Sequence, residues 1–199
     1  MEEYDLLTCK YYAGIGSRKT PEDVLLLMER LAQKLSHRYI LRSGGADGAD
    51  TAFEKGARLP QGEAEVYLPW QGFNKSNSPL HQVDAQALNL ASTLHPGWSE
   101  LGQGPRKLHA RNCYQVLGQN LATPVEFVVC WTSDGCESTR QRRKSTGGTA
   151  TAIVLAERLN IPRFNLFNMK SRQQLFERLK NEGIEVLELL PSGLQNSLF

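Results

Sequence analysis

The sequence has few of the features that mark secreted, zinc-binding or membrane proteins. Its four cysteines form no C-x-x-C pair and no regular framework: Cys9, Cys113, Cys130 and Cys136. This spacing argues against disulfides or zinc as organising features and favours reduced thiols. No apolar run approaches the ~20 residues that span a bilayer, and the acidic start of the chain lacks a signal-peptide pattern. We therefore expect a soluble, cytoplasmic protein with no membrane partner.

An excess of one charge is also missing. The chain has 23 Lys and Arg against 21 Asp and Glu, a formal net charge of +2, so bulk charge predicts neither a nucleic-acid nor a membrane partner. Its length of 199 residues suits one domain with a substantial core and is short for two. We predict a single nucleotide-binding domain over 1–199, with a core at about 11–166, an irregular insertion at 70–104, and a C-terminal helix and tail at 171–199.

Apolar runs and helical periodicity alternate along the chain. Strands are predicted at 11–15, 39–42, 65–69, 127–131 and 161–166, and helices at 21–35, 51–57, 80–93, 106–118, 152–159 and 171–181. Thr20 is the expected cap of the first helix, with Pro21 as its first residue. Residues 184–190 form either a last short strand or a packed tail. Such alternation predicts a doubly wound, mostly parallel α/β sheet, Rossmann-like, in three α/β/α layers.

Three glycine-rich turns are the most distinctive feature of the sequence. They cover residues 14–18, 43–50 and 146–151, and each comes after a predicted strand. Glycine lets the backbone approach a ligand, and free N–H groups at a helix start attract anions. Ligands of doubly wound sheets bind where the strand order reverses, so a central first strand would bring all three turns together. The alternative is that these glycines only serve structural turns.

The turns also carry motifs of a known group of proteins. Gly-Ser-Arg follows the first strand, Ser-Gly-Gly-Ala-x-Gly-Ala-Asp the second, and Gly-Gly-Thr-x-Thr-Ala precedes a late helix. Together they resemble the SLOG superfamily, which includes DprA, the "lonely guy" phosphoribohydrolases and the YspA-like bacterial and phage proteins. The pair Arg111-Asn112 makes the YspA-like branch the closest resemblance. It implies a Rossmann-like domain that binds nucleotides or nucleotide-derived ligands, and a homodimer.

The chain departs from the phosphoribohydrolases at their catalytic residue. In those enzymes a Pro-Gly-Gly-x-Gly-Thr-x-x-Glu motif supplies a glutamate, and an upstream arginine completes the site. Arg111 matches the arginine, but residues 146–153 contain no acid, and the nearest one, Glu157, lies a turn later. The resemblance therefore does not carry this activity over to the chain.

Phosphate recognition is the role that the turns predict best. Cleavage of an N-glycosidic bond would need a carboxylate in addition, with Asp47 and Asp50 as candidates beside Arg111; a helix cap is the structural alternative for Asp50. The residues expected to bind ligand or phosphate are Gly14, Gly16, Ser17, Arg18, Ser43, Gly44, Gly45, Asn112, Thr146, Gly147, Gly148 and Thr149.

Other ligands and partners are less clearly indicated. The four histidines form no recognisable metal-binding set, so no resident metal or cofactor is predicted; a divalent cation held by Asp47, Asp50 and a ligand phosphate is the alternative. The basic run at 140–144 suggests a lid over an anionic ligand, or a patch for single-stranded DNA in the manner of DprA. Three hypotheses result: a nucleotide site, either hydrolase or sensor; a DNA-binding protein; and an interaction module with a vestigial pocket.

Overall fold

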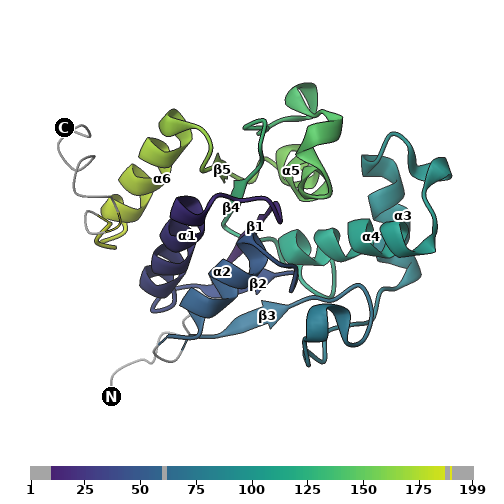
Figure 1. The fold of residues 1–199 in the computed structure, drawn as a ribbon, viewed down its shortest axis with the longest axis horizontal. Coiled ribbons are helices and arrows are strands. Elements are labelled where there is room, and N and C mark those ends of the chain that lie inside the picture. The colour runs from purple at the N-terminus through teal and green to yellow at the C-terminus, as the bar shows by residue number, and fades with distance from the viewer. Residues whose placement is uncertain (1–9, 60–61, 187–188, 190–199) are drawn as a thin grey trace, which may run out of the picture.

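The computed structural model describes residues 10–59, 62–186 and 189. Its sheet contains five parallel strands in the order β3-β2-β1-β4-β5. The strands are β1 (Tyr11–Gly16), β2 (Ile40–Ser43), β3 (Ala64–Val66), β4 (Phe127–Trp131) and β5 (Arg163–Asn165). The predicted doubly wound α/β fold is confirmed, and the described sheet is parallel throughout (Figure 1).

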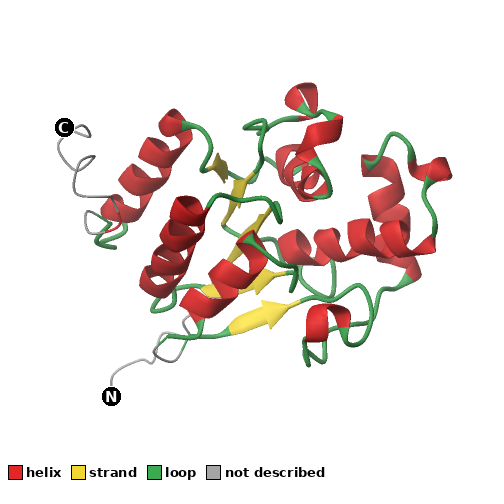
Figure 2. Ribbon diagram, viewed as in Figure 1, coloured by secondary structure: helices red, strands yellow, loops and turns green. Residues whose placement is uncertain are grey.

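Helices cover both faces of the sheet. They are α1 (Glu22–Leu35), α2 (Ala49–Ala57), α3 (Ala85–Leu94), α4 (Gln103–Leu117), α5 (Thr149–Arg158) and α6 (Met169–Asn181). Short 3-10 turns lie at η1 (Phe73–Lys75), η2 (Trp98–Glu100), η3 (Thr139–Gln141) and η4 (Lys144–Thr146). One hydrophobic cluster joins α1, α2 and α6 to the sheet and another joins α3, α4 and α5, which gives the three predicted layers (Figure 2).

Strand β4 shows why its apolar run has no alternation. Phe127, Val129 and Trp131 belong to the cluster on the α1 side, whereas Val128 and Cys130 belong to the cluster on the α4 side. A strand with a helical layer on each face buries every side chain. The sequence pattern at this strand therefore reported burial on two faces correctly.

The strand order reverses beside β1. The chain passes from β1 outward to β2 and β3, then crosses to β4 on the other side of β1 and continues to β5. Gly16 at the end of β1 is in register with Trp131 at the end of β4. The first strand is central, which is the condition under which the three glycine-rich turns can converge, and the carboxyl ends of β1 and β4 form the switch point where ligands bind in such folds.

Several helix boundaries differ from those expected. Helix α2 begins at Ala49, with Gly48 at its cap position, so the structural alternative for Asp50, a helix cap, is wrong. The cap position of α1 is Pro21, and the Thr20 hydroxyl instead donates to the Ser17 carbonyl at 2.7 Å. Apolar periodicity fixes the buried face of a helix better than its ends, which depend on such local hydrogen bonds.

The remaining segments agree with the expectations in part. Helix α3 begins five residues later than predicted, after Asp84, whose Oδ1 accepts from the Ala87 N–H at 2.8 Å. In the predicted tail, Val186 and Leu189 are buried in the cluster on the α1 side, while residues 187, 188 and 190 lie outside the described residues. Among the helices that the structure describes, none combines the length and apolar character needed to cross a bilayer.

Candidate functional site

A cleft of about 580 Å³ opens at the switch point. Its walls come from the loop after β1, the start of α2, one side of α4 and the segment that leads into α5. The residues that line it are Ile15, Gly16, Ser17, Arg18, Lys19, Ala46, Asp50, Leu108, Arg111, Asn112, Gln115, Ser133, Lys144, Ser145, Thr146, Gly147, Gly148 and Thr149.

A buried ion pair lies in the wall of this cleft. Nη1 of Arg111 is 3.3 Å from Oδ2 of Asp50, and the two residues are only 5% and 3% exposed. Burial raises the pKa of Asp50, against the opposing effect of the Arg111 charge, and burial lowers the pKa of Arg111. The buried Nε of Arg111 finds no acceptor among the described residues. The guanidinium therefore retains an unused donor in a lining residue of the cleft.

The turn before α5 presents backbone rather than side chains. Gly147 has φ +67°, and a β-carbon there would meet no described atom within 4 Å. The Asn112 amide donates to the Gly148 carbonyl at 2.7 Å, which ties α4 to the start of α5. Because the first N–H groups of a helix lack acceptors within the helix, this open turn suits an anion.

The residues just before this turn are held by one carboxylate. Oδ2 of Asp134 accepts from the hydroxyls of Thr146 at 2.6 Å and Ser145 at 2.8 Å. Burial acts to raise the pKa of Asp134, but the hydrogen bonds outweigh it and hold that pKa below its usual value. The segment that enters α5 is therefore fixed in place by an ionised side chain.

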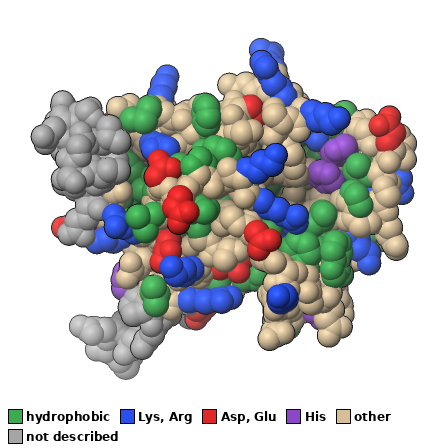
Figure 3. All heavy atoms as spheres, in the orientation of Figure 1, with side chains coloured by type: hydrophobic (Ala, Val, Ile, Leu, Met, Phe, Trp, Pro, Cys, Tyr) green, Lys and Arg blue, Asp and Glu red, His purple; other side chains and the backbone are tan. Residues whose placement is uncertain are grey.

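Positive charge dominates the cleft. Arg18 and Lys19 are exposed on the loop after β1, and Lys144 lines the opposite side. With Arg111 they make four cations, against Asp50 as the one carboxylate among the described lining residues. The guanidinium carbons of Arg18 and Arg111 also lie 6.0 and 5.9 Å from the ring centroid of Phe73. Figure 3 shows Lys, Arg and His side chains close together over the region between α4 and α5.

The structure brings most of the predicted site residues together. Ten of them line the cleft: Gly16, Ser17, Arg18, Asp50, Arg111, Asn112, Thr146, Gly147, Gly148 and Thr149. The first and third glycine-rich turns thus face each other across it. The second turn contributes Ala46 and Asp50 from its end.

Five predicted residues lie outside the lining. A β-carbon at Gly14 would come within 2.6 Å of the Phe53 ring, so this glycine serves packing in the core. Gly44 lies against the guanidinium of Arg111, and Gly45 lines a separate cavity on the other side of the turn. Ser43 is buried and Asp47 is exposed, both outside the cleft.

Neither Glu157 nor Asp47 supplies a carboxylate to the cleft. Glu157 accepts hydrogen bonds from the backbone N–H of Thr139, at 2.7 Å, and from its hydroxyl, so it anchors η3. Because Asp47 is outside the lining, Asp50 alone of the two aspartates could contact a cation there. Among the residues described, no three His, Cys, Asp or Glu side chains gather to hold a metal ion.

Sequence reasoning missed one acid beside the site. Glu54 is 8% exposed, and its Oε1 accepts from the Gly45 N–H at 2.9 Å. Burial, and then the charge of Asp50, raise the pKa of Glu54 to about 7. The signal was present, because Glu54 lies four residues after Asp50 and therefore on the same face of α2. The same spacing on α4 places Gln115 beside Arg111 in the lining of the cleft.

Comparisons with known proteins give one match. No family model matches the chain, and no curated protein matches it. Among solved structures, the chain is similar to the X-ray structure of DNA processing protein A (DprA) from Streptococcus pneumoniae, with a TM-score of 0.49 and 19% sequence identity. The match covers 91% of this chain and 59% of the DprA chain, so the chain spans about three fifths of that protein.

Proposed function

We propose that the cleft binds a nucleotide, or a nucleotide-derived ligand, through its phosphate. The unused donor of buried Arg111, in the cleft that the Gly147–Gly148 turn also lines, is the observation that carries the proposal. Guanidinium groups bind phosphate oxygens in pairs of parallel hydrogen bonds, and the free N–H groups at a helix start donate to the remaining phosphate oxygens. Arg18, Lys19 and Lys144 add to the attraction at the rim. Membership of the SLOG superfamily, and of its YspA-like branch, stays a proposal that rests on the sequence motifs.

Calorimetric titration with AMP tests this binding. Replacing Arg111 by Gln should weaken AMP binding by about tenfold or more, because a hydrogen bond to a charged group contributes roughly 1.5–3 kcal/mol. Arg106→Gln is the matched control on the same helix, since the Arg106 side chain donates to the carbonyls of Trp98 and Ser99 outside the cleft. If the Arg111→Gln variant binds AMP with the same affinity as the native chain, the proposal is refuted.

A second candidate function is hydrolysis of an N-glycosidic bond of the bound nucleotide. It is favoured by Asp50, a buried carboxyl in the cleft whose pKa burial raises. Asp50 would take a proton from water as the water oxygen bonds to the sugar C1′. The C1′–N bond breaks, and the base leaves with its electron pair and accepts a proton. Free base from AMP or NAD, detected by mass spectrometry and lost in Asp50→Asn, would support hydrolysis.

The other outcomes separate the remaining hypotheses. Protection from heat by AMP without release of base would rule out hydrolysis and leave a nucleotide sensor. Binding of single-stranded DNA with a steep salt dependence would favour the DNA-binding alternative. That dependence should then vanish when Arg140, Arg142, Arg143 and Lys144 are replaced together.

A further inference from the structure

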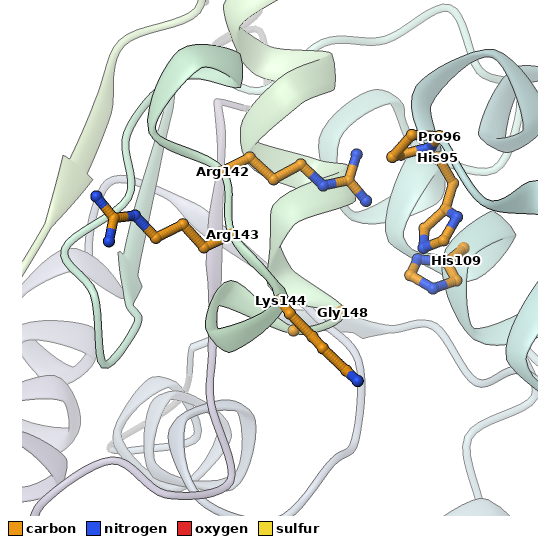
Figure 4. Close-up of a pocket in the computed structure, with 8 residues that line it drawn as sticks. His95, Pro96, His109, Arg142, Arg143, Lys144 and Gly148 are labelled. Carbon is orange, nitrogen blue, oxygen red and sulfur yellow. The ribbon is translucent and has the colours of Figure 1, made fainter.

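A second cavity adjoins the cleft. It has a volume of about 530 Å³ and is lined by His95, Pro96, His109, Arg142, Arg143, Lys144, Gly147 and Gly148 (Figure 4). Lys144, Gly147 and Gly148 also line the first cleft. The two cavities therefore meet at the turn that leads into α5, and one ligand could contact both.

One wall of the second cavity is a pair of histidines. The ring centroids of His95 and His109 are 4.5 Å apart, and Nδ1 of His109 lies 2.7 Å from the Thr151 hydroxyl on α5. Burial lowers the pKa of His95, and it lowers the pKa of His109 to about 4. The buried Nδ1 of His95 has no hydrogen-bond partner in the part of the chain that the structure describes. In the tautomer that carries its proton on Nδ1, His95 therefore has an unused donor for an anionic ligand.

The opposite wall supplies positive charge. In Figure 4 the side chain of Arg142 points across the cavity toward the histidines, whereas that of Arg143 points the other way. Nη1 of Arg142 donates to the Leu94 carbonyl at 2.6 Å, which holds the guanidinium in place. The described lining contains no Asp or Glu, although the charge of Glu100 in η2 acts to raise the pKa of His95. This charge balance, with neutral imidazoles and fixed cations, suits an anion.

We propose that this cavity is a second anion compartment, so that the ligand carries at least two phosphate groups, one on each side of the Gly147–Gly148 turn. The proposal rests on the proposed function of the first cleft and extends it from one phosphate to two. Arg111 and the loop after β1 hold the first phosphate. Arg142, Lys144 and the free nitrogen of His95 hold the second. A small nucleotide with two phosphates and a nucleic-acid strand share this chemistry.

Calorimetric titration of the full chain with AMP, ADP and adenosine 3′,5′-bisphosphate tests the second compartment. At least one of the two-phosphate compounds should bind about tenfold more tightly than AMP, as one further charge-assisted contact predicts. Arg142→Gln should remove that gain and leave AMP binding unchanged. Arg143→Gln is the matched control, because the neighbouring side chain points away from the histidines, and it should keep the gain.

The outcomes separate this inference from the function on which it rests. If AMP binds but neither two-phosphate compound binds more tightly, the second compartment is refuted and the first cleft stands. If Arg142→Gln weakens AMP and the two-phosphate compounds equally, the second compartment is also refuted. If no probe binds, both the second compartment and the proposed function of the first cleft are refuted.

Two further measurements complete the test. Should Arg142→Gln fail to fold, His95→Phe keeps an aromatic ring against His109 but removes Nδ1, and it should abolish the same gain. A ten-residue oligothymidylate identifies the source of the phosphates. Binding tighter than that of ADP, and sensitive to Arg142→Gln, would assign the two compartments to a strand. Weaker binding than that of ADP would assign them to a small nucleotide.

Discussion

The guanidinium of Arg111 lies directly on Gly44. A β-carbon at position 44 would come within 1.1 Å of Nη1 of Arg111 and 2.6 Å of Nε2 of Gln115. Gly44 follows β2, and the missing side chain leaves the space through which Arg111 of α4 reaches Asp50 of α2. The second glycine-rich turn therefore supports the site through the position of Arg111, although its glycines do not line the cleft.

Replacing Gly44 by Ala should displace Arg111 from its pocket. We expect AMP affinity to fall by about tenfold or more and the free energy of unfolding to fall by about 1–3 kcal/mol, as for other overpacked sites. Calorimetry and urea unfolding measure the two effects. Gly104→Ala, where a β-carbon meets no described atom within 4 Å, is the control: it should leave AMP affinity unchanged and should not lower the free energy of unfolding. Native AMP affinity in Gly44→Ala would show that Arg111 is not needed in its present position.

Replacing Asp50 by Asn should change stability and anion binding in opposite directions. Both partners of the Asp50–Arg111 pair are nearly buried, so loss of the carboxylate leaves a buried guanidinium without its counter-ion. We expect unfolding free energy to drop by about 3 kcal/mol. Phosphate and AMP should bind more tightly, because the anion then replaces the missing charge. Weaker binding of both would instead place Asp50 in direct contact with the ligand.

The layers and the switch point could be predicted from local patterns. Three local patterns predicted these features: the uninterrupted apolar residues of β4, the periodic apolar residues of α1 and the glycine after each early strand. The structure confirms the environment that each pattern indicates. Helix ends were harder, because they depend on single hydrogen bonds such as that from the Thr20 hydroxyl to the Ser17 carbonyl. Apolar periodicity shows which face of a helix is buried, but it does not show which hydrogen bond ends the helix.

The site itself could be predicted only in part, because some of its contacts join residues that lie far apart in the sequence. The turns at 14–18 and 146–151 face each other because both follow central strands, which the order of elements implies. The residues around Gly44 do not show that the side chain of Arg111, 67 positions later, packs against this glycine. His109 and Arg111 line different cavities, as their two-residue spacing on a helix predicts. The sequence did not show that these two cavities meet at Gly147.

Asn112 should act by positioning the start of α5. Its amide donates to the Gly148 carbonyl at 2.7 Å, so Asn112→Ala leaves that carbonyl without its partner and frees the turn. We expect a loss of about 1–2 kcal/mol in unfolding free energy, and AMP binding weakened several-fold with the same number of sites. Asn120→Ala is the control, because the Asn120 amide bonds only locally, to Thr123 and Ala122. A stability loss with native AMP affinity would show that the turn keeps its shape without Asn112.

Glu54 should make stability depend on pH in a defined window. Burial and the Asp50 charge raise the pKa of Glu54 to about 7, from an ordinary value of 4.5. Between these two values the folded state holds a proton that the unfolded state has lost, so the contribution of Glu54 to stability falls as pH rises from 4.5 to about 7. Glu54→Gln keeps an acceptor for the Gly45 N–H but does not titrate.

The unfolding free energy of Glu54→Gln should therefore rise relative to the native chain across this window, by at most about 3 kcal/mol. Urea unfolding of both proteins at several pH values between 4 and 8 measures the difference, in which the titrating groups that do not interact with Glu54 cancel. A difference that stays constant over this range would mean that Glu54 has the same pKa in the folded and the unfolded protein. The hydrogen bond from the Gly45 N–H would then offset the effect of burial.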